Sequence, residues 1–198
     1  MKYSLPLSFA FLSILSTSAL AESNEFFRIG LGGSDVFTET ETEVAGFSFF
    51  EEDSVSAGFL YLAGGSDRES NRTYGQLGFS VFEDANLLFL GIGHDWMFTS
   101  RPFQPYVGLS GGLAWLTYTE DYDDGVVTVE LEGVRSRGPA IGGQLGLYYQ
   151  LGDTAALDVS LQALGTSIET EVTFPGLGSV NNEITFIGNT VASLSFVF

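Results

Sequence analysis

The sequence contains no cysteine, a single histidine and few cationic residues. Without cysteine, the chain can form neither a disulfide framework nor the lipid anchor of a lipoprotein. Lysine and arginine together number 7 against 25 Asp and Glu, so the net charge at pH 7 is −18. Such an acidic chain offers no basic patch for phosphate groups, which excludes nucleic acid as a partner.

Long apolar runs are also missing, although 44% of the residues are hydrophobic. No segment after residue 21 approaches the roughly 18 consecutive apolar residues that indicate a membrane-spanning helix. The hydrophobic content is too high for a disordered chain. Acid and apolar residues are instead segregated, and we expect the acidic segments to lie between strands: Glu39–Glu43, Glu51–Asp53, Asp67–Glu69 and Glu120–Asp124.

The first residues have the three parts of a secretory signal peptide. Lys2 is followed by the apolar run Leu5–Leu15 and by the small-x-small site Ala19-Leu20-Ala21. The apolar run is shorter than the roughly 20 residues that a spanning helix needs. We therefore predict that residues 1–21 are a cleaved signal peptide and that residues 22–198 form the mature domain.

The last segment, Ile184 to Phe198, alternates in a way that is unusual for a water-soluble strand. One parity is largely apolar, beginning with Ile184 and Phe186 and ending in Leu194, Phe196 and Phe198, whereas the other is mostly small or hydroxylated. Successive side chains of a strand point to opposite faces. This pattern predicts a strand with lipid on one side and a narrow lumen on the other.

Similar alternation recurs along the whole chain and predicts an all-β, up-and-down transmembrane barrel. Val44–Phe50 also has the alternation of a strand and would bring the number of strands to nine. Single-chain bacterial barrels, however, have an even number of strands. We assign Val44–Phe50 to the first outer excursion or to a long second strand, which gives eight strands; ten remain an alternative. Outer loops are expected near residues 35–53, 83–86, 120–137 and 173–183, and periplasmic turns near 64–72, 99–103 and 151–154.

Several features together resemble the small outer-membrane β-barrels of Gram-negative bacteria, the family of the OmpA transmembrane domain and OmpX-like proteins. They are the signal peptide, the strand opening Pro105-Tyr106-Val107-Gly108 with Gly111-Gly112, the turn Gly152-Asp153-Thr154 and the terminal Phe198. The resemblance implies an outer-membrane location. It also implies that the barrel-assembly machinery reads the terminal residues as an assembly signal, formed here by Leu194, Phe196 and Phe198.

Catalytic motifs are weak. Gly108–Gly112 fits the nucleophile pattern G-x-S-x-G around Ser110, but it lies within a strand and no histidine follows it. The single histidine, His94, has the parity of the lipid-facing residues. Lipid A deacylases would need a His and a Ser close together on one strand, and this chain lacks that pair. We expect no enzyme activity and no cofactor.

The acidic segment Asp121–Gly125 suggests calcium, but its spacing does not fit an EF-hand loop. Two interpretations stay open: a solvated acidic loop, or weak binding of divalent cations by clustered carboxylates.

Three charged residues share the parity of the lumen near the periplasmic end: Arg28, Asp95 and Asp158. An unpaired buried charge is costly, so we predict an internal ion cluster among them. The interior of an eight-stranded barrel is just wide enough for side chains. We expect it to be filled by Tyr74, Gln76, Gln144, Tyr148 and Gln150.

These features favour a non-enzymatic, monomeric outer-membrane barrel in contact with lipid and lipopolysaccharide. Its expected role is to contribute to envelope integrity and to present acidic extracellular loops. An adhesin or a narrow channel for small solutes is the alternative, and a lipid-modifying enzyme is a weaker one.

Overall fold

The computed structural model describes residues 24–44, 47–68, 70–100, 102–120, 122–123, 128–129, 133–174 and 178–198. The predicted signal peptide, residues 1–21, and the expected mature start at Glu22 lie outside these described residues. Among the described residues, no helix is long and apolar enough to cross a membrane.

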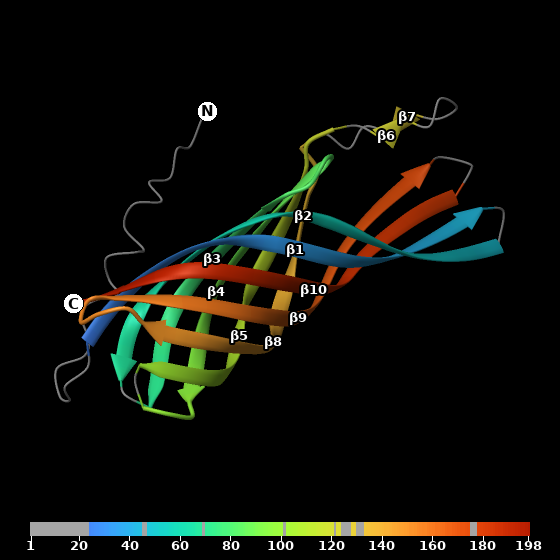
Figure 1. Cartoon of the computed structure of the whole chain (residues 1–198). Coiled ribbons are helices and arrows are strands. Elements are labelled where there is room, and N and C mark those ends of the chain that lie inside the picture. Colours follow the sequence, from blue (N-terminus) through green and yellow to red (C-terminus); the bar gives the residue numbers. More distant parts are fainter. Residues whose placement is uncertain are drawn as a thin grey trace, which may run out of the picture.

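Eight long antiparallel strands close into one barrel within the described part of the chain (Figure 1). Their order around the wall is β1-β10-β9-β8-β5-β4-β3-β2. The prediction of an all-β barrel with eight strands is confirmed, and the ten-strand alternative is wrong. The wall strands are β1 (Asn24–Val44), β2 (Phe47–Arg68), β3 (Asn71–Val81), β4 (Ala85–Met97), β5 (Phe103–Tyr118), β8 (Arg135–Gln150), β9 (Ala155–Phe174) and β10 (Gly178–Val197). A separate two-stranded ladder pairs β6 (Tyr122–Asp123) with β7 (Thr128–Val129).

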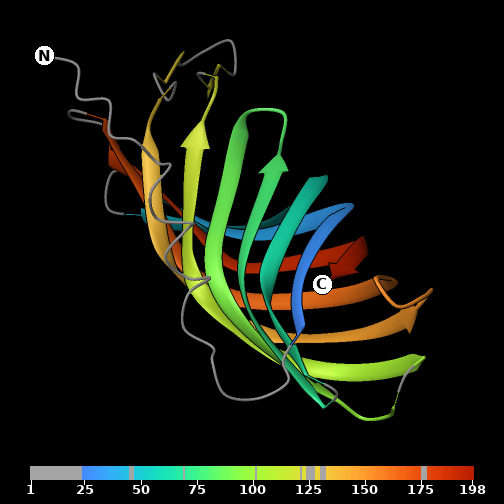
Figure 2. The same cartoon turned by 90° about the vertical axis from the view of Figure 1, so that its left-hand side faces the viewer.

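The wall forms because inward and outward side chains alternate along every strand. In β3 the inward residues Arg72, Tyr74, Gln76 and Ser80 are all buried. Outward residues are mainly branched or aromatic and remain exposed on the isolated chain: Leu31 is 68% exposed, Ile92 is 70% and Ile141 is 75%. Figure 2 shows the strands curving around the enclosed interior. The barrel therefore carries an apolar band on its outer surface.

The two ends of the barrel differ. At one end, called here the terminal end, β1 begins and β10 finishes. The backbones of Glu25 and Phe198 exchange two hydrogen bonds of 3.1 and 3.0 Å there and close the wall. Short connections join β2 to β3, β4 to β5 and β8 to β9 at this end. They overlap the turns predicted near residues 64–72, 99–103 and 151–154.

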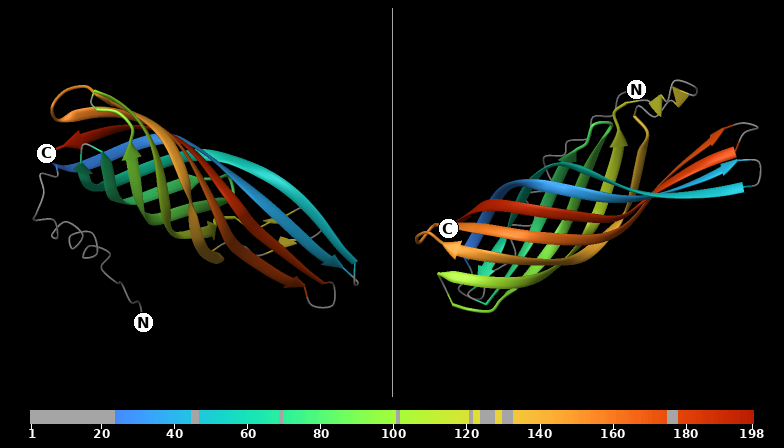
Figure 3. Two further views of the ribbon diagram at one scale, coloured as in Figure 1. Left: turned by 90° about the horizontal axis from the view of Figure 1, so that it is seen from below. Right: turned by 45° about the vertical axis from the view of Figure 1, so that its right-hand side comes forward.

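At the opposite, distal end, two of the predicted loops are wrong. Residues 35–53 and 173–183 were expected to be outer loops, but most of them belong to β1, β2, β9 and β10. These four strands pair with one another well past the ends of their neighbours (Figures 1 and 3). We call this part the distal extension: residues 38–44, 47–53, 167–174 and 178–184. Acidic residues do not end these strands, because their side chains are exposed or half-buried and keep their charge in water, as at Glu39, Glu41, Glu52 and Glu171.

A second correction concerns Ile184, which was assigned to the outward face together with Phe186. The register shifts between Ile184 and Phe186 in the pairing of β10 with β9, and between Phe37 and Thr38 in the pairing of β1 with β10. In the pairing with β1, Thr185 is the extra residue of this β-bulge. A bulge reverses the parity of the strand on one side of it, so Ile184 points inward and is buried.

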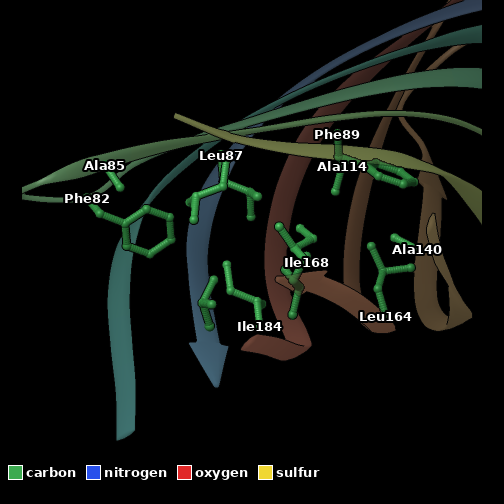
Figure 4. Close-up of a cluster of buried hydrophobic side chains, with 12 residues drawn as sticks. Phe82, Ala85, Leu87, Phe89, Ala114, Ala140, Leu164, Ile168 and Ile184 are labelled. Carbon is green, nitrogen blue, oxygen red and sulfur yellow. The ribbon is translucent and has the colours of Figure 1, made fainter. Parts of the chain in front are cut away.

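The interior changes character along the barrel. Its distal half holds a cluster of buried apolar side chains from six strands and from the turn between β3 and β4, shown in Figure 4, in which Leu87, Phe89 and Ala114 lie across from Ile168 and Ile184. Its terminal half combines aromatic side chains, such as Phe26, Tyr61 and Tyr74, with buried polar and charged groups. Apolar packing thus fills the distal half, and the polar residues gather toward the terminal end.

Candidate functional site

Four charged side chains meet in the terminal half of the interior. We call Arg28, Arg72, Asp95 and Asp158 the lumen ion cluster. Arg28 Nη2 lies 3.2 Å from Asp158 Oδ2, and Arg72 Nη2 lies 3.2 Å from the same oxygen and 3.1 Å from Asp95 Oδ2. All four side chains are at most 1% exposed. Two guanidinium groups and two carboxylates therefore balance their charges inside the wall.

Neutral side chains hold the two carboxylates in place. The Tyr74 hydroxyl donates to Asp95 Oδ1 at 3.0 Å, and the Tyr106 hydroxyl donates to Asp158 Oδ1 at 2.9 Å. Gln144 Nε2 also donates to Asp95 Oδ1. Each carboxylate thus receives hydrogen bonds on one oxygen and an arginine on the other, which is the kind of pairing that a buried charge requires.

Aromatic rings surround the two arginines. The Arg72 guanidinium carbon lies 4.8 Å from the ring centroids of both Tyr106 and Tyr148. Arg28 lies 5.4 Å from the ring of Phe26 and 5.7 Å from that of Tyr74. These distances are within the range of cation–π attraction. The rings and guanidinium groups together fill the cross-section at this level.

Two members of the cluster, Asp95 and Arg72, belong to a longer polar row around the inner wall. Successive cross-strand partners form this row, one from each strand of the barrel: Ser34, Asn189, Gln162, Gln144, Gly108, Asp95, Arg72 and Asp67. Asn189 Nδ2 donates to Gln162 Oε1 at 3.0 Å, and Gln162 Nε2 donates to Ser110 Oγ at 3.2 Å. Gly108 is the position without a side chain, and a Cβ there would meet the Asp95 carboxylate and Gln144.

Sequence reasoning named three of the four cluster members, and the structure brings Arg28, Asp95 and Asp158 together. It missed Arg72, which was placed in the turn expected near residues 64–72. A signal was available, because Arg72 has the same parity as Tyr74 and Gln76, which were correctly assigned to the lumen. Tyr74, Gln76, Gln144 and Tyr148 are buried as expected, and Gln150 is half-buried.

Ser110 and His94 lie on opposite sides of the wall. Ser110 is buried in the interior, where it accepts a hydrogen bond from Gln162. His94 is on the outer side, where its Nδ1 lies 2.7 Å from the hydroxyl of Thr73 and its ring contacts Trp96. A nucleophile and its base must be within hydrogen-bond reach, so these two residues do not form a catalytic pair.

The remaining predicted site residues lie on the surface or outside the described chain. Leu194, Phe196 and Phe198 point outward at the terminal end, with 43%, 42% and 73% of their surface exposed. Most of the acidic segment Asp121–Gly125 lies outside the described residues. Within the described ranges, no group of three or more His, Asp or Glu side chains is arranged to hold a metal ion.

Comparison with known proteins finds similarity at the level of structure. No protein-family model matches the chain, and no curated protein matches it in sequence. The crystal structure of Neisserial surface protein A matches with a TM-score of 0.56 and 15% identity, over 87% of this chain and 97% of that one. The chain has the fold of a small outer-membrane β-barrel.

Two further outer-membrane proteins match less well. The outer-membrane protein OprG of Pseudomonas aeruginosa has a TM-score of 0.48 and 14% identity, over 89% of this chain and 97% of that one. The outer-membrane protease OmpT of Escherichia coli has a TM-score of 0.48 and 10% identity, over 92% of this chain and 99% of that one.

Proposed function

We propose that this protein is a non-enzymatic barrel of the bacterial outer membrane that contributes to envelope integrity and is closed to solutes. The observation that carries the proposal is the filled interior. The lumen ion cluster occupies the terminal half, the apolar cluster around Leu87 and Ile168 occupies the distal half, and Gln76, Gln144 and Gln162 lie between them. An eight-stranded barrel packed in this way has no aqueous channel.

The expected partners follow from the surface. The outward apolar band contacts membrane lipid, and the distal extension faces the lipopolysaccharide side of the membrane. The barrel-assembly machinery inserts the chain, using Leu194, Phe196 and Phe198. The barrel acts as a monomer, because its sheet is already closed and offers no free edge within the wall.

Planar-bilayer recording tests the closed interior. The purified barrel is expected to give no stepwise conductance in 1 M KCl, whereas steady single-channel steps would contradict the proposal. Envelope integrity is tested in a deletion strain by the uptake of a large apolar dye that an intact outer membrane excludes. Restoration by the wild-type chain supports the role, and unchanged uptake after deletion contradicts it.

The distal extension favours adhesion as a second candidate function. It is an ordered sheet of four strands, and Phe49 and Phe50 on β2 are 63% and 76% exposed. Exposed aromatic side chains are typical anchors of protein interfaces. A strain in which residues 39–52 are replaced by a two-residue turn is expected to keep its barrel and lose attachment to surfaces. Unchanged attachment would contradict this candidate function.

A further inference from the structure

A compact group of polar residues interrupts the outward apolar face near the terminal end of the barrel. It occupies six neighbouring outward positions on β2, β3 and β4, and we call it the terminal patch: Ser66, Arg68, Asn71, Thr73, His94 and Trp96. The patch consists of two rows of cross-strand partners, one from Arg68 to Trp96 and the next from Ser66 to His94. Farther from the end, the outward positions of the same strands are apolar: Leu62, Leu77 and Leu90. The patch therefore lies at the edge of the apolar band, where tryptophan is typical of the membrane boundary.

The charge of the terminal patch is positive. Arg68 is exposed, and no salt bridge in the described part of the chain reaches it. Glu25 on β1 borders the patch as the cross-strand partner of Ser66, but the patch itself contains no carboxylate. A single arginine is no site for a polyanion such as nucleic acid. It is sufficient for one phosphate group, which a guanidinium can contact with two N–H groups.

Other hydrogen-bond donors of the patch are held in place. His94 Nδ1 lies 2.7 Å from Thr73 Oγ1, and the His94 ring meets that of Trp96 edge to face at 4.7 Å. When the Thr73 hydroxyl donates to Nδ1, the neutral imidazole carries its proton on Nε2. The hydroxyl oxygen of Ser66 is buried and has no hydrogen-bond partner among the described residues, although buried hydroxyls usually have one. The patch thus offers several donors to an acceptor that the described wall does not supply.

The outer wall lacks side chains directly beside the patch, on the side of the membrane centre. Gly64 and Gly75 are cross-strand partners at outward positions. A Cβ on Gly75 would meet nothing within 4 Å, and one on Gly64 would first meet a backbone oxygen at 3.4 Å. Packing within the chain therefore does not require glycine at Gly75. The bare backbone is bordered by Phe27 and Ile92, which are 43% and 70% exposed, so it forms a gap between two apolar side chains.

We propose that the terminal patch binds the phosphate diester of a glycerophospholipid. Arg68 and His94 Nε2 would contact the phosphate oxygens, and one acyl chain would lie over Gly64 and Gly75. The inference rests on the proposed function, which directs the distal extension to the lipopolysaccharide side and hence the terminal end to the periplasmic leaflet. That leaflet of the outer membrane consists of glycerophospholipids, and basic side chains at a membrane surface attract their phosphates. The inference deepens the proposed function by naming a lipid class that the barrel holds.

Binding is tested with the full mature chain, refolded in detergent micelles and analysed by native mass spectrometry. The probes are phosphatidylglycerol and monogalactosyldiacylglycerol with the same acyl chains, of which only the first carries a phosphate. The wild-type protein is expected to retain phosphatidylglycerol about fivefold more, given the usual contribution of one basic residue at a membrane surface. General surface charge acts against this result, because the chain has 25 acidic and 7 basic residues. Equal or weaker retention of phosphatidylglycerol would overturn the proposal.

Three variants separate the patch from general surface charge. Arg68→Gln removes the cation of the patch, and His94→Phe removes both ring nitrogens while keeping an aromatic ring beside Trp96. The control is Arg137→Gln, which removes the charge of an exposed arginine at the distal end of β8. Both patch variants are expected to lower the preference for phosphatidylglycerol, and the control is expected to keep it. A preference that persists in either patch variant, or that is lost equally in the control, would overturn the proposed site.

A competition experiment tests the source of the phosphate. Glycerophosphoglycerol, the headgroup without its acyl chains, is expected to leave the bound phosphatidylglycerol in place when added at the concentration of the lipid, because it has nothing to lie on the glycine gap. Full displacement would show a site for soluble phosphate esters and overturn the assignment to lipid. These measurements use folded protein in micelles, so their failure leaves the conductance and envelope tests of the proposed function unaffected.

Discussion

Single residues in the interior decide whether the barrel can hold its buried charges. Asp158 is the central member of the lumen ion cluster, because its Oδ2 is shared by Arg28 and Arg72. Asp95 pairs with Arg72 and receives two further hydrogen bonds. Removing one partner of a buried ion pair is far more costly than removing the pair, since the remaining charge stays in a poorly solvated interior. The arrangement implies a ranking among variants of the cluster.

Asp158→Asn is expected to be the most destabilising change in the cluster. It leaves Arg28 without its carboxylate and Arg72 with only Asp95, so the free energy of unfolding should fall by about 3–5 kcal/mol. Arg28→Met should cost less, because Asp158 retains Arg72. Urea unfolding in detergent micelles, followed by tryptophan fluorescence, measures both changes. An unchanged midpoint for Arg28→Met, or the reverse order, would contradict a stabilising role for the cluster.

Gly108 provides a second test of the lumen ion cluster, which depends on steric packing rather than on charge. A Cβ at this position would collide with the Asp95 carboxylate and approach Gln144 Cγ at 2.9 Å. Gly108→Ala is therefore expected to lower the free energy of unfolding by about 1–3 kcal/mol, as overpacking does. The control is Gly143→Ala on the neighbouring strand, where the nearest atom to the new Cβ is a backbone oxygen at 3.5 Å. Equal effects of the two substitutions would show that Gly108 is not needed for the cluster.

At the scale of the strands, β10 performs two tasks, and the bulge at Thr185 separates them. Residues 187–197 form barrel wall, in which Asn189, Ser193 and Ser195 point inward together with aliphatic residues, while Leu194 and Phe196 point outward. Residues 178–184 belong to the distal extension, where Ile184 packs inward and Glu183 faces outward beside Glu39. The bulge accommodates the extra residue, so that both halves keep a favourable orientation although the parity of the sequence changes between them.

Deleting Thr185 should therefore preserve both the barrel and the orientation of the extension. Without the extra residue, regular alternation from Phe186 still places Ile184 inward and Glu183 outward, so a Glu-specific protease should cut the extension at the wild-type rate. Ile184→Asp instead places a carboxylate opposite Ile168 in the buried cluster. Burying that charge should favour local opening, and we expect cleavage about tenfold faster, equivalent to roughly 1.4 kcal/mol. Faster cleavage of the deletion variant, or unchanged cleavage of Ile184→Asp, would contradict this account of the bulge.

The same strand shows what the sequence can and cannot predict. Alternation from Ile187 to Phe198 predicts the wall correctly, because every position there is decided by the contrast between lumen and exterior. The parity of Ile184 was wrong because a single inserted threonine has no distinctive composition. The acidic residues Glu39 and Glu52 were taken as loop residues, since charge usually marks strand ends. Only strand pairing shows that they continue the sheet. Arg72 was missed because the expected turn, residues 64–72, included the first two residues of β3.

On the scale of the whole molecule, polar and apolar groups are sorted along the barrel axis. The charged interior lies toward the terminal end, the apolar interior toward the distal end, and the surface carboxylates of β1, β2, β9 and β10 gather beyond it. Short turns at one end and a long sheet at the other match the two sides of bacterial outer-membrane barrels, which have short periplasmic turns and longer external segments. This asymmetry implies a single orientation in the membrane.

The lack of cysteine makes that orientation directly measurable, because any introduced thiol is the only one in the chain. Glu51→Cys places a thiol on the exposed distal extension, and Asp153→Cys places one in the exposed turn between β8 and β9 at the terminal end. A membrane-impermeant maleimide is expected to label the first variant on intact cells and the second only after the outer membrane is permeabilised. Both substitutions remove one negative charge at an exposed site, so they are matched in their effect on folding. Labelling of Asp153→Cys on intact cells, with Glu51→Cys protected, would mean that the barrel has the opposite orientation in the membrane and that the distal extension faces the periplasm.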